Sequence, residues 1–190
     1  MSFNIKSYEV FVFGIIGAVI GVALPDIDLT LPFLRHRSIV THGFLWPLVA
    51  WLFVVFTHNA RFRFFTIGFA TTLAIHLCYD LYPGGWFGFA RIHVPGYGRL
   101  SGPVSWVWLS ISVIISLYFA LWLVWSMREI ILLAISAAAP FLIMAADNEE
   151  ILLPLISFGV ALAFVFGISK IFHFEPEKMW ATSKVPEEGE

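Results

Sequence analysis

Long apolar runs separated by short polar breaks dominate the sequence. A run of roughly 18 to 22 residues can cross a ~30 Å hydrocarbon core at about 1.5 Å per helical residue. Six such runs can be marked, at about residues 8–24, 39–57, 64–82, 104–127, 130–146 and 151–171. The pattern predicts an all-α integral membrane protein with about six transmembrane helices.

Composition supports a membrane environment. The chain is 59% hydrophobic and only 13% charged, and its mean hydropathy is +0.87. Soluble domains carry about 25% charged residues, so this chain cannot cover a globular surface with polar groups. A net charge of −2 argues against a nucleic-acid partner. With one cysteine, Cys78, neither an intrachain disulfide nor a thiolate metal cage can form.

The six runs are expected to form one polytopic domain over residues 1–171. Residues 172–190 are polar and predict a flexible tail. The first run continues into the polar residues that follow it without a small-residue cleavage site. It is therefore expected to remain as a membrane helix. Glycines 14, 17 and 21 would leave a groove on it for close helix packing. Residues 83–103 form a loop rich in Gly, Pro and aromatic residues, which could re-enter the membrane.

Acidic and histidine residues gather at three places in the chain. The chain has four Asp and six His, and residues 24–42 contain two of each. Asp26 and Asp28 follow the first helix, and His36 and His42 flank the expected start of the second. His76 and Asp80 lie four apart near the end of the third helix, so both project from one face.

Counting membrane crossings puts all three places on one side of the membrane. We therefore expect the six side chains to converge on a metal site in a loop after the first helix. A mixed set of imidazoles and carboxylates suits a divalent ion such as zinc, manganese or iron, and six ligands could hold one ion or two. The alternative is a buried polar network that only ties the helices together.

The chemistry of such a site would be hydrolysis. A zinc-like ion lowers the pKa of bound water to about 7, and a ligand left free could act as general base. Asp26, Asp28 and His93 are the catalytic candidates, although for His93 the sequence favours an interfacial loop residue. Arg37, Arg91 and Arg99 are permanently charged and could bind a substrate phosphate. For Arg35 and Arg37, snorkelling to the interface is an equal alternative.

Positive charge predicts the orientation. Seven Lys and Arg residues fall on the side opposite the cluster and four fall on the cluster side. The positive-inside rule then puts both termini in the cytoplasm and the cluster outside.

Three sequence blocks carry a resemblance to a known family. They are Leu-Pro-Asp-Ile-Asp at 24–28, His-Arg-Ser-Ile-Val-Thr-His at 36–42, and His-Leu-Cys-Tyr-Asp at 76–80 followed by Pro-Gly. In this order they resemble the YdjM-type family of inner-membrane metal-dependent hydrolases, over about residues 21–100. Ser38 stands where that family usually has Gly, Gly43 where it usually has Ser, and one extra residue separates Ser38 from Thr41. The resemblance implies a prokaryotic inner membrane and a metal site made of Asp26, Asp28, His36, His42, His76 and Asp80.

Together these observations predict a membrane-embedded metal-dependent hydrolase acting on a lipid or lipid-linked ester, with a phosphate ester favoured. The alternative is a non-catalytic scaffold or accessory subunit that retains the hydrolase-like fold, which the departures from the family pattern favour. Metal transport is disfavoured, because the last three apolar runs have no ionisable residue in their middles. Membrane lipid is the expected partner, and a membrane-protein partner or a homo-oligomer stays open.

Overall fold

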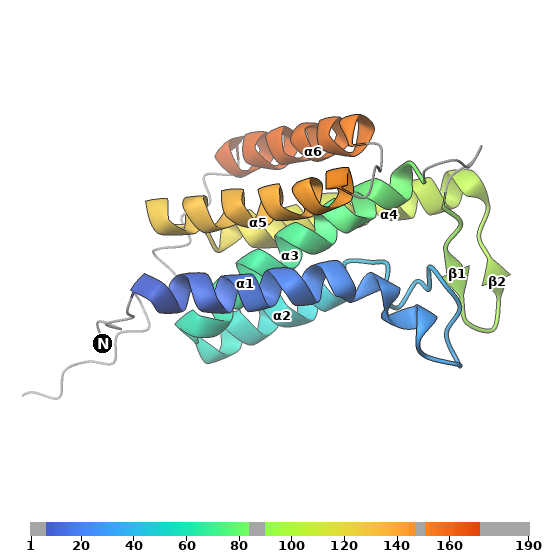
Figure 1. The fold of residues 1–190 in the computed structure, drawn as a ribbon, viewed down its shortest axis with the longest axis horizontal. Coiled ribbons are helices and arrows are strands. Elements are labelled where there is room, and N and C mark those ends of the chain that lie inside the picture. Colours follow the sequence, from blue (N-terminus) through green and yellow to red (C-terminus); the bar gives the residue numbers. More distant parts are fainter. Residues whose placement is uncertain (1–6, 84–89, 147–150, 172–190) are drawn as a thin grey trace, which may run out of the picture.

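The structure, a computed structural model, describes residues 7–83, 90–146 and 151–171. Within these residues the chain forms six α-helices, one short 3-10 helix and one two-stranded hairpin (Figure 1). In chain order they are α1 (Ser7–Ala23), the 3-10 helix η1 (Pro25–Leu29), α2 (Leu45–Thr57), α3 (Ala60–Leu81), β1 (His93–Val94), β2 (Gly98–Arg99), α4 (Gly102–Trp122), α5 (Met127–Ala146) and α6 (Leu152–Ile171).

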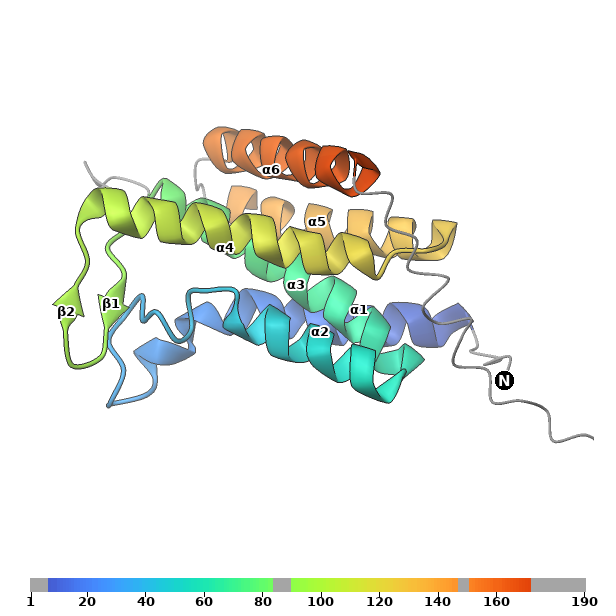
Figure 2. The ribbon, with the colours of Figure 1, turned by 180° about the vertical axis from the view of Figure 1, so that it is seen from behind.

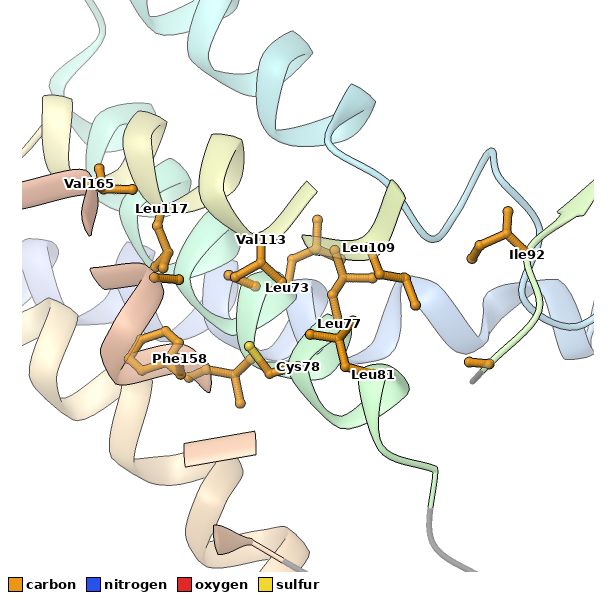
Figure 3. Close-up of a cluster of buried hydrophobic side chains, with 14 residues drawn as sticks. Leu73, Leu77, Cys78, Leu81, Ile92, Leu109, Val113, Leu117, Phe158 and Val165 are labelled. Atoms are coloured by element: carbon orange, nitrogen blue, oxygen red, sulfur yellow. The ribbon is translucent and has the colours of Figure 1, made fainter. Parts of the chain in front are cut away.

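Helix α3 runs through the centre of the bundle and contacts each of the other five α-helices described. Figures 1 and 2, seen from opposite sides, show it between α1 and α2 on one side and α4, α5 and α6 on the other. Its residues Leu73 and Leu77 belong to a buried cluster with Leu109 of α4 and Phe158 of α6 (Figure 3). The predicted all-α class is confirmed.

Three of the described helices are long and apolar enough to cross a membrane: α3, α4 and the segment Leu152–Ser169 of α6. The apolar segments Phe11–Ala23 and Leu45–Thr57 are shorter. The 13 residues of α2 extend only about 20 Å, less than a hydrocarbon core. These helices are compatible with a membrane protein, and the prediction of six spans is supported for three of the described helices.

Helix α2 begins at Leu45, so the prediction that a helix starts at residue 39, with His42 in its first turn, is wrong. Residues 39–44 form turns, in which the N–H groups of Thr41 and His42 donate to the carbonyl of Ser38 at 3.1 and 2.8 Å. Pro47 lies in the first turn of α2, where its missing N–H leaves no helical bond unmade. The prediction from the apolar run misplaces the helix start because the turns before α2 also contain apolar residues.

Helix α3 begins at Ala60, earlier than the predicted residue 64. The side chain of Asn59 accepts a hydrogen bond from the N–H of Phe62 at 3.1 Å, which caps the helix. Arg61 and Arg63 therefore lie on the first turns of α3.

The boundary between α4 and α5 also differs from the prediction. Helix α4 ends at Trp122 and α5 begins at Met127, whereas residues 127 and 130 were expected. The carboxylate of Glu129 accepts the N–H groups of Trp125 and Ser126, at 2.7 and 2.6 Å. Because these donors lie just before the helix, Glu129 caps α5 and fixes its start.

The loop after α3 contains a hairpin that the apolar pattern does not predict. Strands β1 and β2 pair antiparallel, with His93 opposite Arg99. Strand β1 also bridges to Ser38, where the N–H of Ile39 donates to the carbonyl of His93 at 2.8 Å. The hairpin therefore holds the loop that precedes α2. The expected membrane re-entry falls partly on residues 84–89, outside the described residues.

The predicted glycine groove on α1 is confirmed. Side chains added at Gly17 and Gly21 would collide with the backbone carbonyls of Phe65 and Phe69 on α3. The hydroxyl of Thr72 then donates to the carbonyl of Ala18 across the same contact, at 2.9 Å. Small residues thus let α1 and α3 approach closely, as in many membrane helix pairs.

Candidate metal centre

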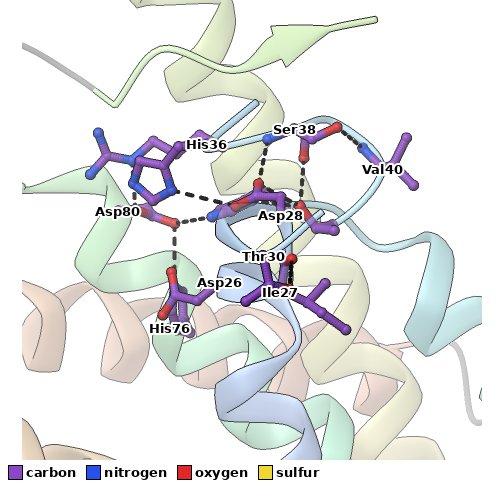
Figure 4. A network of polar contacts seen from close by, with 12 residues as sticks. Asp26, Ile27, Asp28, Thr30, His36, Ser38, Val40, His76 and Asp80 are labelled. Atoms are coloured by element: carbon purple, nitrogen blue, oxygen red, sulfur yellow. Dashed lines mark hydrogen bonds and ion pairs between the residues drawn. The ribbon is translucent and has the colours of Figure 1, made fainter. Parts of the chain in front are cut away.

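Six acidic and histidine side chains meet at one end of the bundle, where η1, the loop before α2 and the C-terminal part of α3 come together (Figure 4). They form one continuous chain of contacts in which acids and histidines alternate. The nitrogen-to-oxygen distances along it are His36–Asp28 3.5 Å, Asp28–His42 3.4 Å, His42–Asp80 3.3 Å, Asp80–His76 3.8 Å and His76–Asp26 3.9 Å.

Asp28 is the buried anchor of this network, with 2% of its surface exposed. Its Oδ2 accepts the backbone N–H of Ser38 at 2.8 Å and the hydroxyl of Thr41 at 2.9 Å. Burial alone would raise the pKa of the Asp28 carboxyl, but the hydrogen bonds it accepts, that of His42 foremost, outweigh burial and hold its pKa well below the usual range. Asp28 is therefore a fixed negative charge with its oxygens already engaged.

His42 lies fully buried between two carboxylates. Its Nδ1 faces Asp28 at 3.4 Å, and its Nε2 faces Asp80 at 3.3 Å. The indole of Trp108 on α4 donates to the backbone carbonyl of His42 at 2.8 Å, which holds the residue from outside the network. Nε2 makes no hydrogen bond within the described residues.

His76 and Asp80 occupy one face of α3, as their spacing of four predicts, and are 8% and 6% exposed. Oδ1 of Asp80 accepts a hydrogen bond from Nε of Arg37 at 3.0 Å. Oδ2 of Asp80 is buried without a hydrogen-bond partner in the described part of the chain. It lies near the ring nitrogens of both His42 and His76.

Asp26 completes the group from the solvent side, with half of its side chain exposed. One ligand atom from each of Asp26, His42 and His76 lies within 4.8 Å of the others, an arrangement that could hold a metal ion. Nε2 of His42 and Oδ2 of Asp80 lie 3.3 Å apart and make no hydrogen bond among the described residues. Both suit this purpose, because a buried polar atom usually has a hydrogen-bond partner. Imidazole and carboxylate together are a donor set that zinc, manganese and iron accept.

The structure separates the six predicted residues into two sets. Asp26, His42 and His76 form the group that could hold an ion, and Asp80 lies beside both of these histidines. Asp28 and His36 lie farther out, where Asp28 touches His42 and the partly exposed His36 touches Asp28. The sequence cannot make this distinction, because Asp26 and Asp28 are two residues apart and only the turn of η1 decides which is buried.

The other predicted residues lie around the centre. His93 of β1 is outside the metal-type group found among the described residues, and its Nδ1 is buried without a hydrogen bond there. Arg37 is engaged with Asp80 and is thus not a free phosphate ligand in this structure. Arg91 and Arg99 are exposed near and on the hairpin.

Two hydroxyl residues and one tryptophan contribute more than the sequence suggests. The backbone N–H of Ser38 and the hydroxyl of Thr41 both donate to Asp28. Their position in the sequence between His36 and His42 could have identified them as part of the site. Trp108 lies 66 residues from His42, and no local pattern connects the two. The acidic turn at 147–150, expected on the same side, lies outside the described residues.

Comparisons with protein-family models, with curated proteins and with solved structures found no match to this chain.

Proposed function

We propose that this protein is a membrane-embedded, metal-dependent hydrolase whose divalent ion is held by Asp26, His42, His76 and Asp80. The observation that carries the proposal is the pair of buried atoms at the centre of the cluster, Nε2 of His42 and Oδ2 of Asp80, which lie 3.3 Å apart and make no hydrogen bond within the described residues. A buried polar atom without a hydrogen bond typically costs about 1–3 kcal/mol, and a cation would give both atoms a ligand contact at once. Zinc, manganese and iron fit the donors, and the proposal is for one ion in this group.

Asp28 has a supporting role in this scheme. A histidine that binds a metal through one ring nitrogen usually donates its other N–H to a carboxylate or carbonyl. The 3.4 Å approach of Nδ1 of His42 to Asp28 has this form and directs Nε2 toward the centre. His36 in turn lies beside Asp28 at the exposed edge of the network.

A divalent ion bound here supplies Lewis acidity, the property that lets such sites activate water near neutral pH. Of the three catalytic candidates, Asp28 is engaged by hydrogen bonds, and His93 is outside the metal-type group. Asp26 is the carboxylate that remains half exposed. Asp26 is therefore the group best placed to accept the proton of a water molecule that attacks an ester.

The substrate we propose is a membrane lipid or a lipid-linked ester, preferably a phosphate ester. Apolar side chains next to the site are exposed, with Ile27 at 43%, Leu29 at 63% and Phe33 at 75%. Such side chains suit a site that meets lipid. The exposed Arg91 and Arg99 supply positive charge near the hairpin for a phosphate group.

The wider setting belongs to the same proposal. It places the chain in a prokaryotic inner membrane, with about six spans, cytoplasmic termini and the site on the outer side. The positive-inside count and the resemblance to the YdjM-type family support this setting. The resemblance also implies the reaction class.

The test is hydrolysis of a phospholipid panel by the metal-loaded, detergent-purified protein. Asp26→Asn should reduce turnover at least about 100-fold, because it removes both a proposed ligand of the ion and the carboxylate proposed to accept the proton. His58→Asn, at the opposite end of the bundle, serves as the control and should leave turnover unchanged. Identical behaviour of wild type and Asp26→Asn on every lipid would contradict the hydrolase proposal.

A second candidate function is a non-catalytic scaffold in which the cluster only joins elements. The observation in its favour is that each of the six side chains already lies beside another of opposite type. Such a protein would bind no metal and would co-purify with a fixed stoichiometric membrane partner.

A further inference from the structure

Arg37 has an unusual backbone at the edge of the candidate centre. Its φ is 63°, in the left-handed region that residues other than glycine seldom adopt. The carbonyl of Arg37 accepts the N–H of His93 at 2.8 Å, and the N–H of Ile39 donates back to the carbonyl of His93. Strand β1 thus holds the chain on both sides of Ser38 and keeps Arg37 in this conformation.

The side chain of Arg37 reaches from this loop to α3. Its Nε donates to Oδ1 of Asp80 at 3.0 Å, and only 26% of the arginine side chain is exposed. The other oxygen of Asp80 lies 3.3 Å from Nε2 of His42 and 3.8 Å from Nε2 of His76. Arg37 therefore occupies one oxygen of the carboxylate and leaves the other facing the two imidazoles.

We propose that Arg37 is a positioning residue that holds Asp80 in the orientation needed to present Oδ2 to a divalent cation. This inference rests on the proposed function, because it concerns the same metal centre. Arg37 acts in two ways: its guanidinium fixes the rotation of the carboxylate, and its charge offsets the buried negative charge of Asp80. Because Arg37 is engaged in this role, a substrate phosphate would be bound by other cationic side chains.

The strained backbone supports this assignment. Strained residues persist where the surrounding structure holds them, and they concentrate at functional sites. Glycine would fit φ of 63° without strain, yet the chain has an arginine whose side chain points into the network. The neighbouring Arg35 is exposed and makes no ion pair among the described residues, which makes it a matched control.

The test is titration of the metal-free, full-length protein with cobalt(II), followed by visible absorption, which reports both affinity and coordination. Arg37→Gly removes the guanidinium while suiting the backbone, so the fold should persist, as thermal unfolding would check. We expect affinity to fall about tenfold or more, as for other outer contacts of metal ligands, and the absorption bands to change. Arg37→Lys should recover part of the affinity, and Arg35→Gly should match wild type.

A double-variant cycle distinguishes positioning from a general structural effect. In the Asp80→Asn background, Arg37→Gly should change cobalt affinity less than twofold, because the carboxylate it positions is gone. If the two losses multiply, or if Arg37→Gly keeps the affinity and spectrum of wild type, Arg37 does not position Asp80.

If wild type binds no cobalt, the proposed metal centre itself fails. If wild type binds and Arg37 variants match it, only the positioning role is lost.

Discussion

At the residue scale, the site depends on a few buried polar atoms with defined partners. Asp28 shows how a carboxylate can stay ionised inside a mostly apolar chain, because a backbone N–H and a hydroxyl both donate to it. The stabilisation is mutual, since those donors are satisfied by the same oxygen. The conformation of the turn between η1 and α2 therefore depends on the charge of Asp28.

This arrangement predicts acid sensitivity of the metal-free protein. The pKa of Asp28 in the folded chain is below its ordinary value of 3.8, so its contribution to stability is fully present above that value and is lost as the pH falls below it. Asp28→Asn should lower stability at neutral pH by about 1–3 kcal/mol. The variant should then lose less further stability than wild type on acidification.

Thermal unfolding in detergent with a chelator, from about pH 6 down to about pH 2, measures both effects, and wild type and variant should diverge below the ordinary pKa of the carboxyl. The account of Asp28 would be wrong if wild type and variant lost stability in parallel over this range.

At the element scale, a second ion pair fixes the opposite end of the bundle. Arg63 of α3 pairs with Glu129 of α5, and the Arg63 guanidinium lies 4.0 Å from the ring centre of Trp125. Glu129 is 2% exposed and also caps α5. A single carboxylate thus sets the start of one helix and joins it to the central one.

Glu129→Ala should therefore destabilise the protein strongly. It leaves the mostly buried Arg63 without its anion, a change that typically costs about 3–5 kcal/mol. Glu9 pairs with the exposed Arg61 at the same end, so Glu9→Ala is the matched control and should cost about 0–1 kcal/mol. Chemical unfolding in detergent compares the two, and equal losses would show that burial of the pair is unimportant.

The element scale also shows what the sequence could and could not predict. Apolar runs located the six described α-helices, since a long apolar segment satisfies its own backbone hydrogen bonds by forming a helix. Their ends were misplaced wherever a tertiary contact decides, as for α2, whose preceding residues turn around Asp28, and α5, which starts at the Glu129 cap. The hairpin was missed because its strands are two residues each and carry no alternation.

At the scale of the whole molecule, counting crossings brought the acids and histidines to one side, and the structure places the six side chains in one network. The spacing of four residues on a helix predicted that His76 and Asp80 lie on one face. Which carboxylate is buried, and the link from Arg37 to Asp80 across 43 residues, depend on tertiary packing and could not be derived from spacing.

The whole bundle is arranged so that α3 carries the site. The helix is enclosed by all the other described α-helices, and its last turns hold His76 and Asp80 beside the loops (Figures 1 and 4). Close packing of α1 on α3 brings η1, and with it Asp26 and Asp28, to the same end. A rigid central helix is a suitable support for ligands that must keep their geometry.

The most direct test of this account is metal content, measured by elemental analysis of detergent-purified wild type, Asp26→Asn, His42→Gln and the control His58→Asn. Wild type and control should contain about one equivalent of zinc, manganese or iron, and the two site variants should contain much less. Absence of metal from folded wild type, even after incubation with each ion, would contradict the metal centre and leave a structural polar network in its place.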